Sequence, residues 1–169
     1  MNIGPATLED AFGIAKVHVR SWQSVYAGLM EAEFLERLSV DERTIRWRDI
    51  LQKAESQTFV ARQGASVVGF VSFGKCRDEG APEKQGEIWA LYAQPEVWGQ
   101  GVGRTLMERA AQELRMRGHV GTSLWVLSQN QRAVRFYETF GFKRIPGSEK
   151  RLELGGRQVE EVCFVLNDA

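Results

Sequence analysis

The sequence predicts an α/β fold in which helices flank a central mixed, mostly antiparallel sheet. Helical periodicity in the first third gives way at residue 57 to alternating apolar and polar residues. Two alternating segments, 57–63 and 67–77, are separated by the turn at 64–66, as in an antiparallel hairpin. A strand, a glycine loop, a helix and a strand then follow over 87–128, the order of a parallel crossover. The 169 residues fit one domain, 1–169.

The first third is predicted to be mostly helical after a short strand at 2–5. Thr7 and Asp10 have the spacing of a capping box. The helix that follows runs to about Tyr26, and its apolar face consists of Ile14, Val17, Trp22 and Val25. Two further helical segments, 28–39 and 40–54, are broken near Gly28 and Ser39.

The remaining elements alternate between strands and helices. A polar loop at 76–87 precedes a strand at 87–95. A helix runs from about Gly101 to Arg117, and Gly118 ends it. A strand at 122–128, a short helix at 129–140 closed by Gly141, and two last strands at 142–145 and 159–166 complete the prediction.

Composition narrows the classes of function. Lys and Arg together number 22, as do Asp and Glu, so the chain lacks the basic excess of a nucleic-acid-binding protein. The first residues lack a basic region followed by an apolar run, and no segment approaches the ~18 apolar residues of a membrane span. Cys76 and Cys163 form no CxxC pair, which indicates free thiols and no metal site. These features predict a soluble, cytoplasmic protein that binds neither nucleic acid nor membrane.

Three glycines stand at alternate positions, Gly99, Gly101 and Gly103, just before an amphipathic helix. A helix start exposes unpaired N–H groups and a partial positive charge, which together favour an anion, and glycines allow a phosphate to approach the backbone. Arg104 and Arg109 add charge nearby. The loop fits neither the phosphate-binding GxxxxGK pattern nor the dinucleotide GxGxxG pattern. The alternative is that the glycines only serve to turn the chain.

The segment 98–103 resembles the R/Q-x-x-G-x-G/A motif of the GNAT superfamily of acetyl-CoA-dependent N-acetyltransferases. A second block also resembles that family, because Asn130, Ala133, Tyr137 and the pair Gly141-Phe142 recur at its spacings. Trp98 departs from the motif, which usually has Arg or Gln there. The resemblance implies the GNAT fold, acetyl-CoA as cosubstrate, and a coenzyme A pyrophosphate held by the loop amides of Gly99, Gln100, Gly101, Val102, Gly103 and Arg104.

The resemblance also implies two catalytic residues. Glu87 stands eleven positions before Trp98, where many members carry a glutamate that removes the amine proton directly or through water. Tyr137 is the implied acid that protonates the leaving thiolate. Glu87 could instead face solvent or pair with Lys84 or Arg104, and Tyr137 could be a core aromatic residue.

Further coenzyme contacts are implied by the same resemblance. Backbone amides of Leu91, Tyr92 and Ala93 would pair with the pantetheine arm, since in the family this strand splays away from its neighbour. Asn130 would bond to the pantetheine, although Ser128 to Gln131 also reads as a helix start with a capping box.

The acceptor is predicted to be a primary amine, acetylated by direct transfer, on a small molecule or a peptide. His18, Trp22 and Tyr26 form a row at helical spacing that could border the amine pocket, with His18 as an alternative base. An aromatic row at this spacing is more often part of the core. The competing functions are a non-catalytic acyl-CoA-binding sensor or interaction module and a protein that binds ATP or NAD. An exposed last strand could pair across a homodimer.

Overall fold

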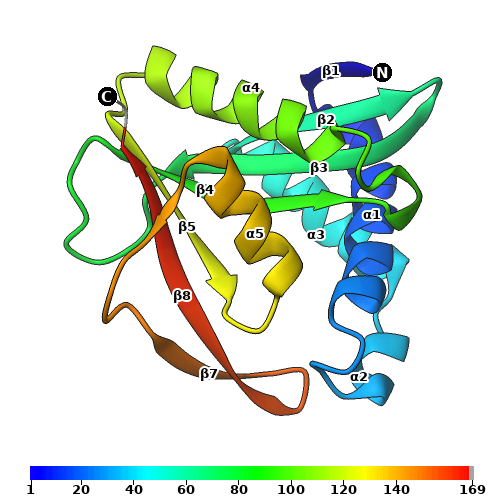
Figure 1. Ribbon diagram of the computed structural model, residues 1–169. Helices are drawn as coiled ribbons and strands as arrows, with labels where there is room; N and C mark the ends of the chain where they lie inside the picture. Colours follow the sequence, from blue (N-terminus) through cyan, green and yellow to red (C-terminus); the bar gives the residue numbers. More distant parts are fainter. Residues whose placement is uncertain (168–169) are drawn as a thin grey trace.

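The structure is a computed structural model that describes residues 1–167. One eight-stranded sheet has the order β1-β2-β3-β4-β5-β8-β6, and β7 pairs with β8 (Figure 1). Only β4 and β5 pair in parallel, so the sheet is mixed and mostly antiparallel, as predicted. The strands are β1 (Asn2–Pro5), β2 (Gln57–Gln63), β3 (Ser66–Lys75), β4 (Gln85–Ala93), β5 (Gly121–Leu127), β6 (Lys143–Arg144), β7 (Lys150–Leu154) and β8 (Arg157–Asn167).

Helices cover both faces of the sheet. The helices are α1 (Ala11–Val25), α2 (Ala32–Glu36), α3 (Val40–Lys53), α4 (Val102–Met116) and α5 (Gln131–Phe140), with short 3-10 turns at Leu8–Asp10 and Pro95–Val97. Phe70 of β3 packs with α1 and α3, whereas the next residue, Val71, packs with α4. Because successive strand residues point to opposite faces, α1 and α3 lie on one face and α4 and α5 on the other (Figure 1).

The centre of the sheet is open. β4 and β5 are paired only from Gln85 to Ile88 on β4, opposite Gly121 to Leu124 on β5. Beyond that point each strand stays paired with its outer neighbour, β4 with β3 and β5 with β8. The register of β3 and β4 shifts where Trp89 is the extra residue, and a bulge of this kind bends a strand. The bend therefore accounts for the divergence of β4 from β5.

Local signals fix most boundaries as predicted. The Thr7 N–H donates to Asp10 Oδ2 at 2.7 Å ahead of α1, and Ser39 caps α3. Gly141, with φ of 112°, ends α5. In the described part of the chain, no helix is both long and apolar enough to cross a membrane.

Three expectations differ from the structure. β7 is not predicted, because its charged, half-exposed residues give no clear alternation. Asn130, rather than Ser128, is the N-cap of α5. The last strand, β8, lies inside the sheet between β5 and the pair β6 and β7, so it is not an exposed edge. Residues 168–169 of the predicted domain lie outside the described residues.

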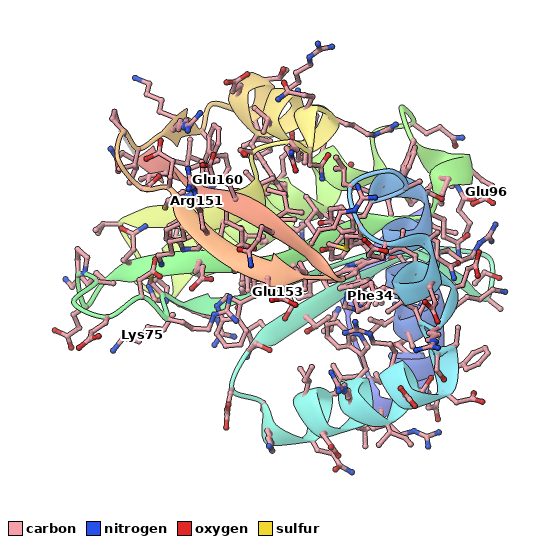
Figure 2. All side chains as sticks on the ribbon, turned by 90° about the horizontal axis from the view of Figure 1, so that it is seen from below. Phe34, Lys75, Glu96, Arg151, Glu153 and Glu160 are labelled. Atoms are coloured by element: carbon pink, nitrogen blue, oxygen red, sulfur yellow. The ribbon has the colours of Figure 1, made fainter. Side chains whose placement is uncertain are left out.

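The hairpin of β7 and β8 reaches the loop between α1 and α2. The Glu31 N–H donates to the Gly155 carbonyl at 2.9 Å, and Arg157 donates to the Gly28 carbonyl at 3.1 Å. Figure 2 shows Phe34 of α2 near the tip of this hairpin. A Cβ at Gly155 would lie 2.9 Å from Met30 and from Phe34, so only glycine fits this contact. The far end of the sheet is thereby joined to the helical first third.

Candidate active site

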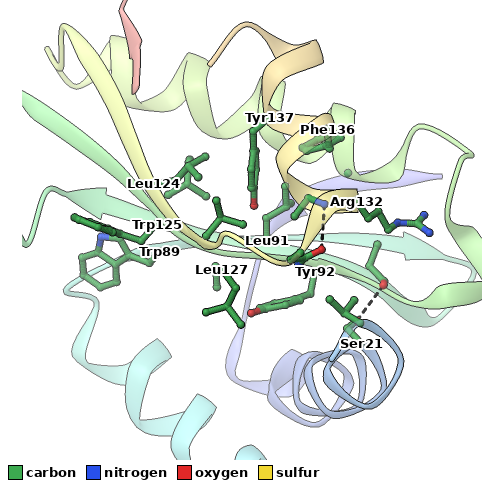
Figure 3. Close-up of a pocket in the computed structure, with 18 of the residues that line it drawn as sticks. Ser21, Trp89, Leu91, Tyr92, Leu124, Trp125, Leu127, Arg132, Phe136 and Tyr137 are labelled. Atoms are coloured by element: carbon green, nitrogen blue, oxygen red, sulfur yellow. Dashed lines mark hydrogen bonds between the residues drawn. The ribbon is translucent and has the colours of Figure 1, made fainter. Parts of the chain in front are cut away.

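A cavity of about 840 Å³ occupies the opening between β4 and β5. Its volume lies within the range of small-molecule sites, roughly 300–1,000 Å³. Lining residues come from both faces of the sheet, including Val102 and Phe136 on one side and Trp22 and Leu152 on the other. Figure 3 shows Phe136 above the opening and Ser21 of α1 below it. The cavity therefore lets two ligands meet from opposite faces.

The glycine loop forms one end of this cavity. Gly99 and Gly101 have φ of 75° and 82°, which disfavour any residue with a Cβ, and a Cβ at either would meet open space. The first α-helical bond after the loop runs from the Thr105 N–H to the Gly101 carbonyl at 3.0 Å. The amides of Val102, Gly103 and Arg104 precede that bond and are therefore available to an anion. A pyrophosphate group fits this arrangement.

Trp98 holds the glycine loop in place. Its indole N–H donates to the Ala93 carbonyl at 2.8 Å, which ties the loop to the end of β4. The guanidinium carbon of Arg132, in the first turn of α5, lies 3.7 Å from the centroid of the Trp98 ring. Arg104 is instead paired with Glu108, and Arg109 donates to Gln112. The cation that the structure adds to the loop is Arg132, which the sequence analysis did not single out.

The exposed polar edge of β4 faces the cavity. The Gln94 N–H donates to the Val68 carbonyl of β3 at 2.9 Å. Polar groups in an antiparallel pair alternate in direction, so Tyr92 also turns its amide to β3, whereas Leu91 and Ala93 turn theirs toward the opening. The Ala93 carbonyl agrees with this, because it accepts from Ser21 Oγ at 3.0 Å and from Trp98. Two of the three predicted amides therefore point into the cavity.

Tyr137 lies at the middle of the cavity. Its ring is buried against Phe136 and Phe142, and its hydroxyl points into the cavity (Figure 3). Burial, with a smaller contribution from Tyr92, raises the pKa of the Tyr137 phenol, which keeps it protonated at neutral pH. Asn130 also borders the cavity, but its side-chain oxygen accepts from the Ala133 N–H at 3.2 Å and so caps α5.

Glu87 is buried and ion-paired. Its carboxylate accepts from the Arg77 N–H at 2.8 Å and from the Arg77 side chain, while the guanidinium of Arg77 stacks on Trp89. Glu87 therefore neither faces solvent nor pairs with Lys84 or Arg104, although it does border the cavity.

The predicted row on α1 is divided between cavity and core. Trp22 and Tyr26 border the cavity, whereas His18 packs among aromatic rings and stacks on Tyr92. His18 Nδ1 accepts from Trp47 Nε1 at 3.2 Å. Burial, and to a lesser extent Arg43, lowers the pKa of His18 to about 3, so the imidazole is neutral at physiological pH.

The opposite end of the cavity contains a carboxylate that the sequence analysis did not single out. Glu161 of β8 borders the cavity, and burial raises the pKa of its carboxyl group. The alternation of apolar and polar residues along β8 is visible in the sequence, but no local signal shows which of its two faces borders a cavity. Among the described residues no three His, Cys, Asp or Glu side chains are grouped to hold a metal ion.

Several solved N-acetyltransferase structures share this fold. The PaiA N-acetyltransferase from Thermoplasma acidophilum in complex with coenzyme A superposes with a TM-score of 0.75 at 20% identity, covering 99% of this chain and 100% of that one. A ribosomal-protein-alanine N-acetyltransferase from Brucella melitensis superposes with a TM-score of 0.77 at 20% identity, covering 99% of both chains. At this identity the likeness establishes the fold.

Sequence comparison establishes the family. The residue pattern of the acetyltransferase (GNAT) family matches residues 22–142. The uncharacterized N-acetyltransferase YuaI of Bacillus subtilis (strain 168) is 34% identical over 163 residues, which cover 96% of this chain and 90% of that protein. The spermidine N(1)-acetyltransferase of Thermoplasma acidophilum is 24% identical, covering 85% of this chain and 88% of that protein.

The chain belongs to the acetyltransferase (GNAT) family, as its motifs predict. It is accordingly an N-acetyltransferase that uses acetyl-CoA.

Proposed function

We propose that this protein transfers the acetyl group of acetyl-CoA directly to the primary amine of an acceptor bound in the same cavity. The observation that carries the proposal is the cavity itself, which passes through the opening between β4 and β5 and is reached from both faces of the sheet. Acetyl-CoA enters from the α4 and α5 side and the amine from the α1 and β7 side. No covalent acetyl-enzyme is required.

The coenzyme is held mainly by backbone. The Gln100 N–H donates to the Val97 carbonyl at 3.3 Å. The other loop amides, of Gly99 and of Gly101 to Arg104, bind the pyrophosphate, supported by the positive end of α4. Arg132, held on the Trp98 ring, supplies the charge that the loop lacks. The exposed amides of Leu91 and Ala93 pair with the pantetheine arm and polarise the thioester carbonyl.

Tyr137 and Glu87 handle the protons in this proposal. The neutral amine attacks the thioester carbonyl, a C–N bond forms, and the C–S bond breaks. The Tyr137 phenol then donates its proton to the leaving sulfur, a role supported by its raised pKa and its position in the cavity. The amine proton leaves through water to Glu87, whose orientation is fixed by Arg77.

Free thiol release from acetyl-CoA with a panel of amines tests this mechanism. Tyr137→Phe and Glu87→Gln are each expected to lower kcat by about 10²-fold, the usual contribution of a positioned acid or base, with little change in coenzyme affinity. Glu138→Gln is the matched control, since Glu138 is an exposed neighbour on α5. Unchanged kcat in both variants would remove these roles. Coenzyme binding without thiol release for any amine would favour the non-catalytic acyl-CoA-binding module.

The cellular setting is part of the same proposal. A cytoplasmic location is supported by the two buried free cysteines, Cys76 and Cys163, which suit a reducing compartment. A single domain is supported by the continuous sheet that runs from β1 to β6. A homodimer remains a prediction, and light scattering on the purified chain measures it.

A further inference from the structure

The half of the cavity on the α1 and β7 side is walled by apolar side chains and bounded by protein at its far end. Its apolar wall is formed by Val25, Tyr26, Leu127, Leu152 and Leu154. At the far end, the tip of the β7–β8 hairpin is hydrogen-bonded to the α1–α2 loop through Glu31 and Gly155.

One carboxylate that lines this half of the cavity has no cationic partner among the described residues. Arg77 is paired with Glu87, and Lys150 Nζ lies 3.2 Å from Asp78 Oδ1 while it stacks on Trp125. Glu161 is left without a hydrogen bond or an ion pair among the residues that the structure describes. Of the described carboxylates that line the cavity, Asp78 and Glu87 have cationic partners and Glu161 has none. The nearby cation Arg43 of α3 lies over the Trp22 ring instead.

The position of Glu161 suits contact with a ligand. It pairs in register with Leu127 of β5 and with Lys150 of β7, so all three side chains share one face of the sheet. The titratable groups that face its carboxylate are Lys150 and Arg77, which favour its ionised form, and Tyr26 and Tyr92, whose hydroxyls are 3.5 Å apart. A half-buried carboxylate without a partner is costly unless a cation joins it.

We propose that this half of the cavity binds a small organic ammonium compound with an apolar or aromatic portion, and that Glu161 receives its ammonium group. The apolar portion lies against Tyr26, Leu152 and Leu154. Glu161 is thus a specificity-determining residue for the acceptor, an inference that rests on the proposed acetyl transfer. The acceptor binds as its cation and gives one proton through water to Glu87 before it attacks. Its second proton replaces the one that the Tyr137 phenol gives to the leaving sulfur.

Binding of phenethylammonium and of its uncharged counterpart, 2-phenylethanol, tests the proposal without turnover. Each is titrated by calorimetry into the protein saturated with coenzyme A. Glu161→Gln is expected to weaken phenethylammonium binding by about tenfold and to leave 2-phenylethanol and coenzyme A unaffected. Glu161→Asp, which keeps the charge, is expected to restore part of the affinity.

Glu160→Gln is the matched control. Glu160 is the neighbouring carboxylate on β8, its register partner is Arg151, and it points to the opposite face (Figure 2). This variant is expected to bind both compounds as the wild type does. An equal loss for both compounds in Glu161→Gln, no loss for phenethylammonium, or no phenethylammonium binding by the wild type would each overturn the proposal.

Steady-state kinetics separate this inference from the proposed function. With phenethylamine, Glu161→Gln is expected to lower kcat/KM about tenfold, mainly through a higher KM, since Glu161 holds the ammonium group before that nitrogen loses its proton and attacks. A wild type that releases no thiol with any amine contradicts the proposed transfer. A wild type that turns over phenethylamine with a KM unaltered by Glu161→Gln contradicts only the assignment of Glu161.

Discussion

At position 98 a tryptophan stands where the family motif has Arg or Gln. The indole N–H is used to hold the Ala93 carbonyl, and the ring face supports Arg132. A positive charge is therefore present at the loop, but it comes from α5. Local contacts also explain why His18 is a poor candidate for the base. Its Nδ1 already accepts a hydrogen bond from Trp47, and burial lowers its pKa to about 3.

Arg132→Gln is expected to weaken coenzyme A binding by about fivefold, equivalent to about 1 kcal/mol, because an exposed cation contributes modestly. Calorimetry at low and high salt measures the effect, which should shrink at high salt. Arg135→Gln, on an exposed face of the same helix, is the control. Equal coenzyme affinity in the wild type and Arg132→Gln would show that the pyrophosphate is bound without this residue.

His18 makes the free energy of unfolding depend on pH. Its folded pKa, about 3, lies below the unfolded value near 6.5, so the unfolded state binds more protons between these values. Its contribution is complete above pH 6.5 and is lost as pH falls toward 3, by about 1.4 kcal/mol per pH unit. Urea unfolding from pH 7 to 4 should therefore show a shallower pH dependence for His18→Gln. Parallel curves for the two proteins contradict this prediction.

At the scale of elements, the start of α5 contributes both to the stability of the helix and to the lining of the cavity. Asn130 caps the helix through the Ala133 N–H, and the same helix carries Arg132 and Tyr137 into the cavity. The bulge at Trp89 acts at the same scale, because the bend in β4 separates it from β5. The cap sets where Arg132 and Tyr137 lie in the cavity, and the bulge sets where the free edge of β4 lies.

Asn130→Ala is expected to lower the free energy of unfolding by about 1 kcal/mol through loss of the cap. Asn130→Asp should retain most of the stability, since Asp is an equally good N-cap. Urea unfolding and coenzyme titration on both variants make the comparison. Full stability of Asn130→Ala together with weakened coenzyme binding would favour the implied pantetheine contact over the cap.

At the scale of the whole molecule, the separation of β4 from β5 leaves a large cavity at a place where two fully paired strands would be in contact. α4 and α5 cover one side of it, and α1 with the β7–β8 hairpin covers the other (Figure 1). A ligand bound in the opening makes contacts with both strands that the strands do not make with each other. The stability of the chain is therefore expected to depend on the coenzyme.

Coenzyme A at 100 times its Kd is expected to stabilise the folded state by about 2.7 kcal/mol. For a chain of this size that corresponds to a rise in Tm of roughly 5–10 °C. Thermal unfolding with coenzyme A, ATP and NAD at matched concentrations measures it. A larger shift with ATP or NAD than with coenzyme A contradicts coenzyme selectivity and favours a nucleotide-binding protein.

The sequence by itself determined the order of elements apart from β7, the glycine loop and the family, because caps, turns and periodicity are local signals. Thr7, Ser39, Gly101 and Gly141 each mark a boundary that the structure keeps. The motif blocks likewise placed Tyr137 and Glu87 near the loop, and both border the cavity.

Only the tertiary structure decided the partners of these residues. Arg77 on Glu87, Arg132 on Trp98, and the unpaired Glu161 all depend on segments that are distant in sequence and adjacent in the sheet. The path of β4 beyond Ile88 also depends on other strands, because β4 bulges against β3 and β5 is no longer paired with it there. Side-chain periodicity specifies which face of a strand is apolar. That Glu161 has no cationic partner can be seen only once β5, β7 and β8 lie side by side in the sheet.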